Sequence, residues 1–279
     1  MKSRDHSSAK NFFGSTRIFK FYLLFIIFQF AEKFSSAQDD CYEKFFASAQ
    51  KPVTAKTQVI RDDGKTVLLS AFMKEHSSPE MEVKALCGLA DLDNDGKKEL
   101  VVYGYTGGAH CCDEFYFFSN TAPNQYKFAG KTFGGDVCVS KNQFLFSFDE
   151  QFGYFFTCFA CSLEDNSEVR LTPMHNIVLN YVQGKLQVAS PDEHIRSNID
   201  QNLVKLSKEP YEKLEDESDQ DNGLRKEFAM NLAVYYFSFG KDMLATQTLF
   251  NKYYKFADAK KVWATFVKQI QYMATINSF

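Results

Sequence analysis

The stretch Asp91-Leu-Asp-Asn-Asp-Gly-Lys-Lys-Glu99, followed directly by Leu100-Val-Val-Tyr-Gly-Tyr105, decides the fold class of this chain. Its first part places carboxylates at loop positions 1, 3, 5 and 9, and the glycine at position 6 permits a sharp turn. Its second part is rich in β-formers, so the loop leads into a strand. An EF-hand would carry a glutamate at position 12, where this chain has Val102.

This loop has the ligand types that calcium prefers. Calcium takes roughly six to eight oxygen atoms at about 2.3–2.6 Å, and alternate residues of a tight loop converge on one centre. The sequence therefore predicts a Ca²⁺ site. Its expected ligands are the carboxylates of Asp91, Asp93, Asp95 and Glu99 and the backbone carbonyl of Lys97. The alternative is a hairpin turn without an ion, because Asp and Gly are favoured turn residues in any case.

The span Cys87–Tyr105 resembles an FG-GAP/VCBS-type repeat, the calcium-loop unit of integrin α-chain propellers. In that family the loop reads D-x-D-x-D-G-x-x-D/E and a strand follows it directly. All four loop carboxylates match the family's ligand positions. The following Tyr105-Thr-Gly-Gly-Ala-His-Cys-Cys112 resembles a motif of exported bacterial proteins of unassigned function. A propeller needs at least four blades, but no second D-x-D-x-D-G occurs, so the resemblance implies a compact β-domain with one calcium loop.

Residues 1–37 have the form of a secretory signal peptide. Met1–Lys20 is basic and rich in serine, and Phe21–Ala31 is an uncharged apolar run. That run is shorter than the roughly 20 residues of a membrane-spanning helix. The small residues Ser35-Ser-Ala37 predict cleavage after Ala37. We expect a secreted or periplasmic protein without stable membrane insertion, and an uncleaved anchor is the alternative.

The charge balance argues against nucleic acid as a partner. The whole chain has 32 Lys and Arg against 35 Asp and Glu. Removing residues 1–37 takes away six basic and two acidic residues, which leaves 26 against 33, a net charge of −7. An acidic chain without a basic cluster binds polyphosphates poorly. The 45% of apolar and 24% of charged residues are typical of a globular protein.

The chain has seven cysteines, which in an oxidising compartment are disulfide candidates before they are zinc ligands. Besides Cys41, the candidates are Cys87, Cys111, Cys112, Cys138, Cys158 and Cys161. The run Gly153–Phe159 resembles a strand, in which residues three apart lie about 10 Å apart. This exceeds the roughly 7 Å that separates bridged Cα atoms at most. We therefore expect the 111/112 doublet to pair with the 158/161 doublet, with a zinc site that includes His110 as the alternative.

The periodicity changes near residue 190. Before it, short apolar runs alternate with turn signals, which indicates antiparallel β-structure. The predicted strands are Val67–Met73, Lys84–Ala90, Leu100–Tyr105, Glu114–Phe118, Phe144–Phe148, Gly153–Phe159, Glu168–Thr172 and Lys185–Val188. The sequence thus predicts an α+β fold: a signal peptide over 1–37, a β-rich domain with the calcium loop over 38–189, and an α-helical domain of about four helices over 190–279.

Helix signals mark the second half. Ser190-Pro-Asp-Glu193 has the pattern of a capping box with proline at the first helical position. A second helix runs from Leu224 and ends at Gly240, and a third begins after Asp242. The apolar positions of a fourth extend from Val262 to Met273.

The sequence contains no G-x-S-x-G, H-E-x-x-H or phosphate-loop motif. We therefore expect a non-catalytic exported protein, a calcium-stabilised binding or scaffold module of the periplasm or cell surface with a protein or glycan partner. The alternative is a thiol-dependent or metal-dependent exported hydrolase. That enzyme would use Cys111 or Cys112 together with a histidine such as His175.

Overall fold

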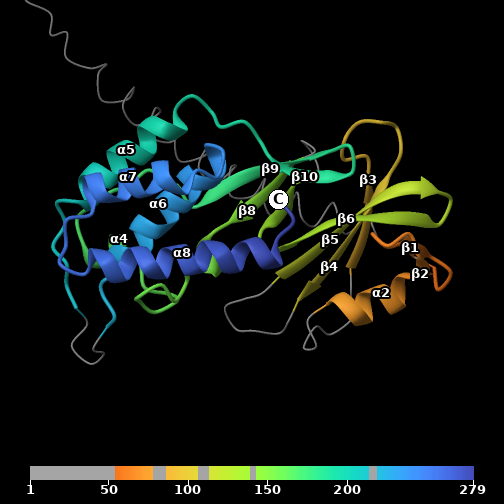
Figure 1. Ribbon diagram of the computed structural model, residues 1–279, viewed down its shortest axis with the longest axis horizontal. Helices are drawn as coiled ribbons and strands as arrows, with labels where there is room; N and C mark the ends of the chain where they lie inside the picture. The colour runs from red at the N-terminus through yellow and green to blue at the C-terminus, as the bar shows by residue number, and fades with distance from the viewer. Residues whose placement is uncertain (1–53, 78–85, 106–112, 139–142, 214–218) are drawn as a thin grey trace, which may run out of the picture. The chain divides into compact units, whose positions relative to one another are not determined.

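The structure, a computed structural model, describes residues 54–77, 86–105, 113–138, 143–213 and 219–279 (Figure 1). Their strands form two sheets. Sheet A has the order β2-β1-β6-β5-β4-β3, and sheet B has the order β10-β9-β8-β7. All neighbouring strands are antiparallel except β1 and β6, which are parallel. The strands are β1 (Gln58–Ile60), β2 (Thr66–Leu68), β3 (Leu86–Ala90), β4 (Glu99–Tyr105), β5 (Asp113–Ala122), β6 (Gln125–Phe133), β7 (Asp136–Cys138), β8 (Gln143–Ser147), β9 (Asn176–Val182) and β10 (Lys185–Val188).

The two faces of sheet A belong to different cores, because successive strand side chains point to opposite faces. Leu100 and Val102 of β4 pack with helix α2 (Leu69–His76), which covers one face. Val101 belongs to the larger core, which sheet A shares with sheet B and the C-terminal helices. Alternate residues of β4 therefore belong to two separate apolar clusters, one on each face of sheet A.

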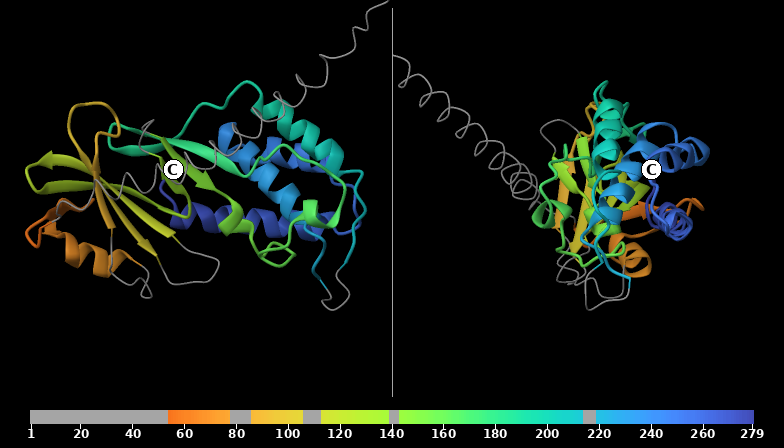
Figure 2. Two further views of the ribbon diagram at one scale, coloured as in Figure 1. Left: turned by 180° about the vertical axis from the view of Figure 1, so that it is seen from behind. Right: turned by 90° about the vertical axis from the view of Figure 1, so that its left-hand side faces the viewer.

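The remaining helices all follow β8, and the long ones follow β10 (Figures 1 and 2). They are α3 (Asp149–Phe152), α4 (Leu163–Asn166), α5 (Ile195–Leu206), α6 (Leu224–Ser238), α7 (Met243–Tyr253) and α8 (Ala259–Ile276). Helix α6 is buried over nearly its whole length and contacts β9, whereas α8 contacts β6. Within the described residues, no helix combines the length and the apolar character that crossing a membrane requires.

Strands and helices share one core. The ring of Phe279 packs edge-on against Phe146 of β8 and against Phe237 of α6, with ring centroids 4.8 and 5.4 Å apart. Phe148 stacks on Phe237 at 5.6 Å. Among the described residues, elements on either side of the expected boundary at 189/190 therefore share one core.

The last residues of the chain are hydrogen-bonded to sheet A. Ser278 N donates to Lys131 O at 2.9 Å, and Lys131 N donates to Ser278 Oγ at 2.9 Å. Phe133 N donates to Asn277 Oδ1 at 2.7 Å. Residues 277–279 thus connect β6 with the aromatic core beneath it.

The predicted α+β class is confirmed: β-rich sheets come first and four long helices follow. The helix signals at Gly240 and Asp242 are confirmed too. Gly240 adopts φ +87° just after α6, and the Asp242 carboxylate accepts hydrogen bonds from the first amides of α7. The start predicted at Ser190 is wrong, because His194 N donates to Asp192 Oδ1 at 2.8 Å in a turn before the helix, and α5 begins only at Ile195.

Three predicted strands are wrong in whole or in part. Gly153–Phe159 forms turns, from which Phe155 and Phe156 pack into the larger core. Glu168–Thr172 is irregular and pairs with no strand among the described residues. The run Val67–Met73 changes to helix at Leu69, because its apolar residues Leu69, Phe72 and Met73 match a helical period and cover sheet A.

Candidate metal centre

The acidic loop connects β3 and β4, which pair antiparallel up to Ala90 and Glu99. Two left-handed residues close the loop, Asn94 with φ +60° and Gly96 with φ +85°. Asp91 holds the turn, because its Oδ1 accepts from Asp95 N and its Oδ2 from Gly96 N, both at 3.0 Å. Loops of this shape place alternate side chains on the inside of the turn.

Three carboxylates converge inside this loop. One oxygen from each of Asp91, Asp93 and Glu99 lies within 4.8 Å of the others. This separation fits a shared calcium ion, since two oxygens on opposite sides of it lie at about twice 2.4 Å. Asp93 Oδ1 is buried and has no hydrogen-bond partner. A buried oxygen without a partner costs free energy, and a cation would remove that cost.

Glu99 is the anchored member of the set. It is the first residue of β4, only 3% exposed, and its Oε2 accepts from Leu92 N at 2.8 Å. Burial raises the pKa of Glu99, and the negative charges of Asp93 and Asp95 raise it further. The same charges act on Tyr181 of β9, whose pKa burial raises to about 12. The loop therefore concentrates negative charge that a cation would neutralise.

The structure does not bring every expected ligand into the cluster. Asp95 turns toward Lys97: its Oδ1 accepts from Lys97 N at 2.8 Å, and its Oδ2 lies 3.3 Å from Lys97 Nζ. The backbone hydrogen bond from Lys97 lowers the pKa of Asp95. Asp91, Asp93 and Glu99 are therefore the residues whose side chains could hold an ion in this arrangement.

The cysteines are distributed differently from the expectation. Cys158 and Cys161 form a disulfide with each other, with their Cα atoms 5.0 Å apart. The expected pairing with the 111/112 doublet is thus corrected for these two residues, because their segment is a turn and not a strand. Cys41, Cys111, Cys112 and the loop of His110 lie outside the described residues, as does the side chain of Cys138 in β7. Burial raises the pKa of the Cys87 thiol on β3 to about 11.

A second titratable cluster lies away from the loop and was not predicted. His175 lies between two carboxylates: Nδ1 is 3.3 Å from Asp149 Oδ1, and Nε2 is 3.0 Å from Glu227 Oε2. Burial opposes the imidazolium charge, but the hydrogen bonds to both carboxylates outweigh it and raise the pKa of His175 to about 10. The two partners are on α3 and α6, so no local sequence pattern signals this cluster.

The chain matches no family model, no curated protein and no solved structure.

Proposed function

We propose that this chain is a non-catalytic exported protein, a binding or scaffold module that calcium stabilises and that recognises a protein or glycan. One observation carries the proposal: Asp93, whose buried Oδ1 has no hydrogen-bond partner, converges with Asp91 and Glu99. Calcium supplies charge neutralisation at such a loop. Export rests on the signal-peptide pattern of residues 1–37, and the resemblance to FG-GAP/VCBS-type repeats agrees with a calcium loop.

The loop supports a structural function for the ion. Leu92, inside the loop, is buried in the larger core, and its amide is bound by Glu99. An ion that ties Asp91 and Asp93 to Glu99 would fix the hairpin of β3 and β4 against that core. All three carboxylates would then bind the ion and hold the loop in its conformation.

The hydrolase alternative needs a histidine that can accept a proton near neutral pH. His175 does not support it, because two carboxylates hold its ring and its pKa lies near 10. A histidine in that state is charged at neutral pH and cannot act as a general base. The geometry of His175 therefore favours the non-catalytic proposal.

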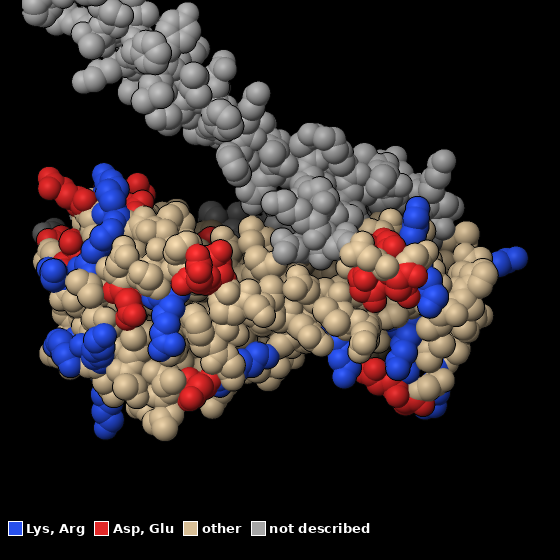
Figure 3. Space-filling model, turned by 90° about the horizontal axis from the view of Figure 1, so that it is seen from above, with Lys and Arg blue, Asp and Glu red and all other residues tan. Residues whose placement is uncertain are grey.

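One face of the described residues agrees with a partner other than nucleic acid. On the face drawn in Figure 3, basic and acidic side chains alternate without a large basic area. A cleft of about 910 Å³ lies between α3, the turn after it and α8. Tyr154 on its rim is 68% exposed. An exposed aromatic ring beside the polar side chains of Gln220 and Gln269 suits a protein or glycan contact.

The test is calcium-dependent stability of the exported protein. Calcium at one hundred times its dissociation constant should raise the free energy of unfolding by about 2.7 kcal/mol. The melting temperature rises accordingly, and Asp93→Asn should abolish the rise. At a temperature between the two wild-type midpoints, partner capture from an envelope extract should require calcium.

The matched control is Asp63→Asn. Asp63 lies in another acidic turn, where Oδ1 accepts from Lys65 N at 3.0 Å, and it belongs to no group of three or more converging metal-ligand residues among the described residues. This variant should keep the full calcium response in both melting and capture. A wild-type melting curve that calcium leaves unchanged would reject the ion site, and capture that ignores calcium at the intermediate temperature would reject its link to binding.

A further inference from the structure

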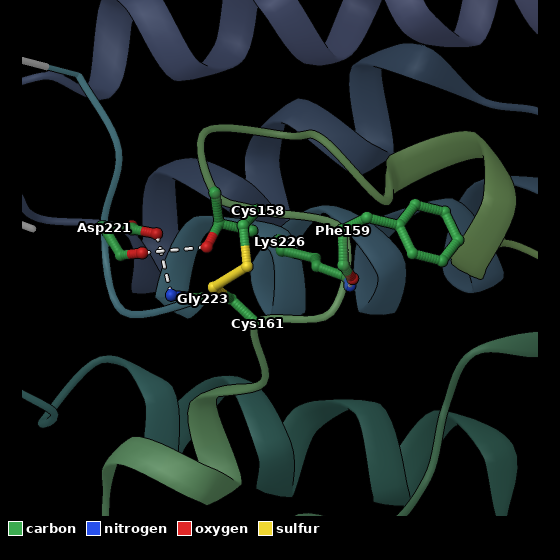
Figure 4. The surroundings of a disulfide bond; sticks show 7 residues. Cys158, Phe159, Cys161, Asp221, Gly223 and Lys226 are labelled. Atoms are coloured by element: carbon green, nitrogen blue, oxygen red, sulfur yellow. Dashed lines mark hydrogen bonds between the residues drawn. A yellow bond between two sulfur atoms is a disulfide. The ribbon is translucent and has the colours of Figure 1, made fainter. Parts of the chain in front are cut away.

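The Cys158–Cys161 disulfide lies in a turn beside the start of α6 (Figure 4). Cys161 N donates to Cys158 O at 3.1 Å, which closes the turn around Phe159 and Ala160. Both cysteines are half-buried and Ala160 is exposed, so the bridge lies at the surface. Thiols in solution can therefore approach it.

The bridge contributes little to holding the chain in its fold. It links residues three apart, and a short loop removes little freedom from the unfolded chain. Other contacts already anchor this segment on α6 and the residues before it. Asp221 N donates to Phe156 O at 2.8 Å, and Thr157 Oγ1 donates to Asp221 O at 2.9 Å. The segment should keep its place when the bridge opens.

A lysine ammonium lies at the turn. Lys226, in the first turn of α6, donates from Nζ to Phe159 O at 3.0 Å, the carbonyl between the two cysteines (Figure 4). The same Nζ lies 5.8 Å from the centroid of the Phe159 ring. A nearby positive charge favours the thiolate form of cysteine, which is the form that leaves and attacks in thiol–disulfide exchange.

From this arrangement we propose that Cys158 and Cys161 form a redox-active pair that exchanges with thiols, with Lys226 as the residue that stabilises the thiolate. A thiolate RS⁻ attacks one sulfur, the Cys158–Cys161 bond breaks, and the other cysteine leaves as a thiolate in the turn that Lys226 contacts at Phe159 O. A second RS⁻ then attacks the RS sulfur of the mixed disulfide. It releases RSSR and the second cysteine thiolate, and the thiolates take up protons from water. The protein gains two electrons, and two thiols are oxidised.

The experiment equilibrates the exported full-length chain in buffers of reduced and oxidised glutathione. Alkylation traps the thiols, and peptide mass spectrometry reads the 158/161 pair separately from the other cysteines. The pair should be reduced in buffers in which near-ultraviolet circular dichroism stays native. Lys226→Gln should slow alkylation of the reduced pair at neutral pH about tenfold, because losing the charge raises the thiol pKa by about one unit.

Two variants separate this effect from a general disturbance. Lys226→Arg keeps the charge and should keep the wild-type rate of alkylation. Lys252→Gln removes a lysine on α7, whose Nζ lies 4.5 Å from the ring centroid of Tyr253, and should leave the rate unchanged. A pair that stays oxidised in every glutathione buffer that preserves the fold would overturn the proposal. An equal rate of alkylation for Lys226→Gln and Lys252→Gln would show that Lys226 does not stabilise the thiolate.

Discussion

His175 shows how one residue can hold three elements together. It precedes β9 and contacts α3 through Asp149 and α6 through Glu227. Glu227 is only 5% exposed, so its charge needs a partner inside the protein. Lys226 also acts on both carboxylates, although its own pKa is lowered by burial. The imidazolium therefore stabilises the packing of α3 and α6 against sheet B.

This cluster predicts a loss of stability at alkaline pH. The pKa of His175 is about 10 in the folded protein, against the ordinary 6.5. Because the folded pKa is raised, its contribution is complete below about pH 6.5 and is lost as the pH rises through 10. Urea unfolding should show His175→Gln about 2 kcal/mol less stable than wild type at pH 6, and the two free energies should converge above pH 10.

The control for this prediction is His194→Gln. The His194 side chain is 74% exposed and faces only Glu193, which is itself exposed. Its substitution should change stability by less than about 0.5 kcal/mol at any pH. A His175→Gln profile parallel to that of wild type from pH 6 to 10 would contradict the assigned pKa.

At the scale of the element, helix α6 begins in a crowded place. Gly223 precedes its first residue with φ +99°, and a Cβ there would lie 2.8 Å from Leu163 N. The first turn of the helix holds Arg225, which is fully buried and donates from Nε to Asp221 Oδ2 at 2.8 Å. Stacking of its guanidinium over Phe156, 4.2 Å from the ring centroid, fixes the same end of the helix.

A pair of glycine substitutions tests this crowding. Gly240, after α6, also has a positive φ of +87°, but a Cβ there would meet nothing within 4 Å. Gly240→Ala should lower the free energy of unfolding by about 1 kcal/mol, because alanine pays the cost of a left-handed backbone conformation. Gly223→Ala adds a clash with fixed backbone and should cost about 2–4 kcal/mol. Chemical denaturation measures both, and equal costs would show that the α4 segment moves away freely.

The sequence predicted elements and site residues correctly where residues that are close in the sequence are also close in space. The D-x-D-x-D-G spacing is enough to predict that Asp91, Asp93 and Glu99 converge, and the caps at Gly240 and Asp242 end and begin helices by themselves. Gly153–Phe159 was wrongly predicted to be a strand, because an aromatic run in a buried turn has the same composition as a buried strand. The pairing of His175 with Glu227 could not be predicted, because Glu227 lies 52 residues away on another element.

On the scale of the whole molecule, the shared core predicts that the β-rich part cannot stand alone. A fragment of residues 38–189 would expose Phe146 and Phe148, which pack on Phe279 and Phe237 in the full chain. Exposed aromatic area of this kind leads to aggregation. The fragment should bind the dye ANS and lack near-ultraviolet circular dichroism, whereas the chain 38–279 should not bind the dye. A soluble fragment with a cooperative melting curve would restore the division into two domains.

The hydrogen bonds between residues 277–279 and β6 have a consequence for synthesis. Strands β1 to β6 leave the ribosome long before Ser278. This serine lies 147 positions after Lys131, its hydrogen-bond partner in β6. Until translation reaches those residues, Phe146 and Phe237 lack the ring of Phe279 between them. Nascent chains would therefore stay incompletely packed until residues 277–279 have been made, which would suit the export proposed above.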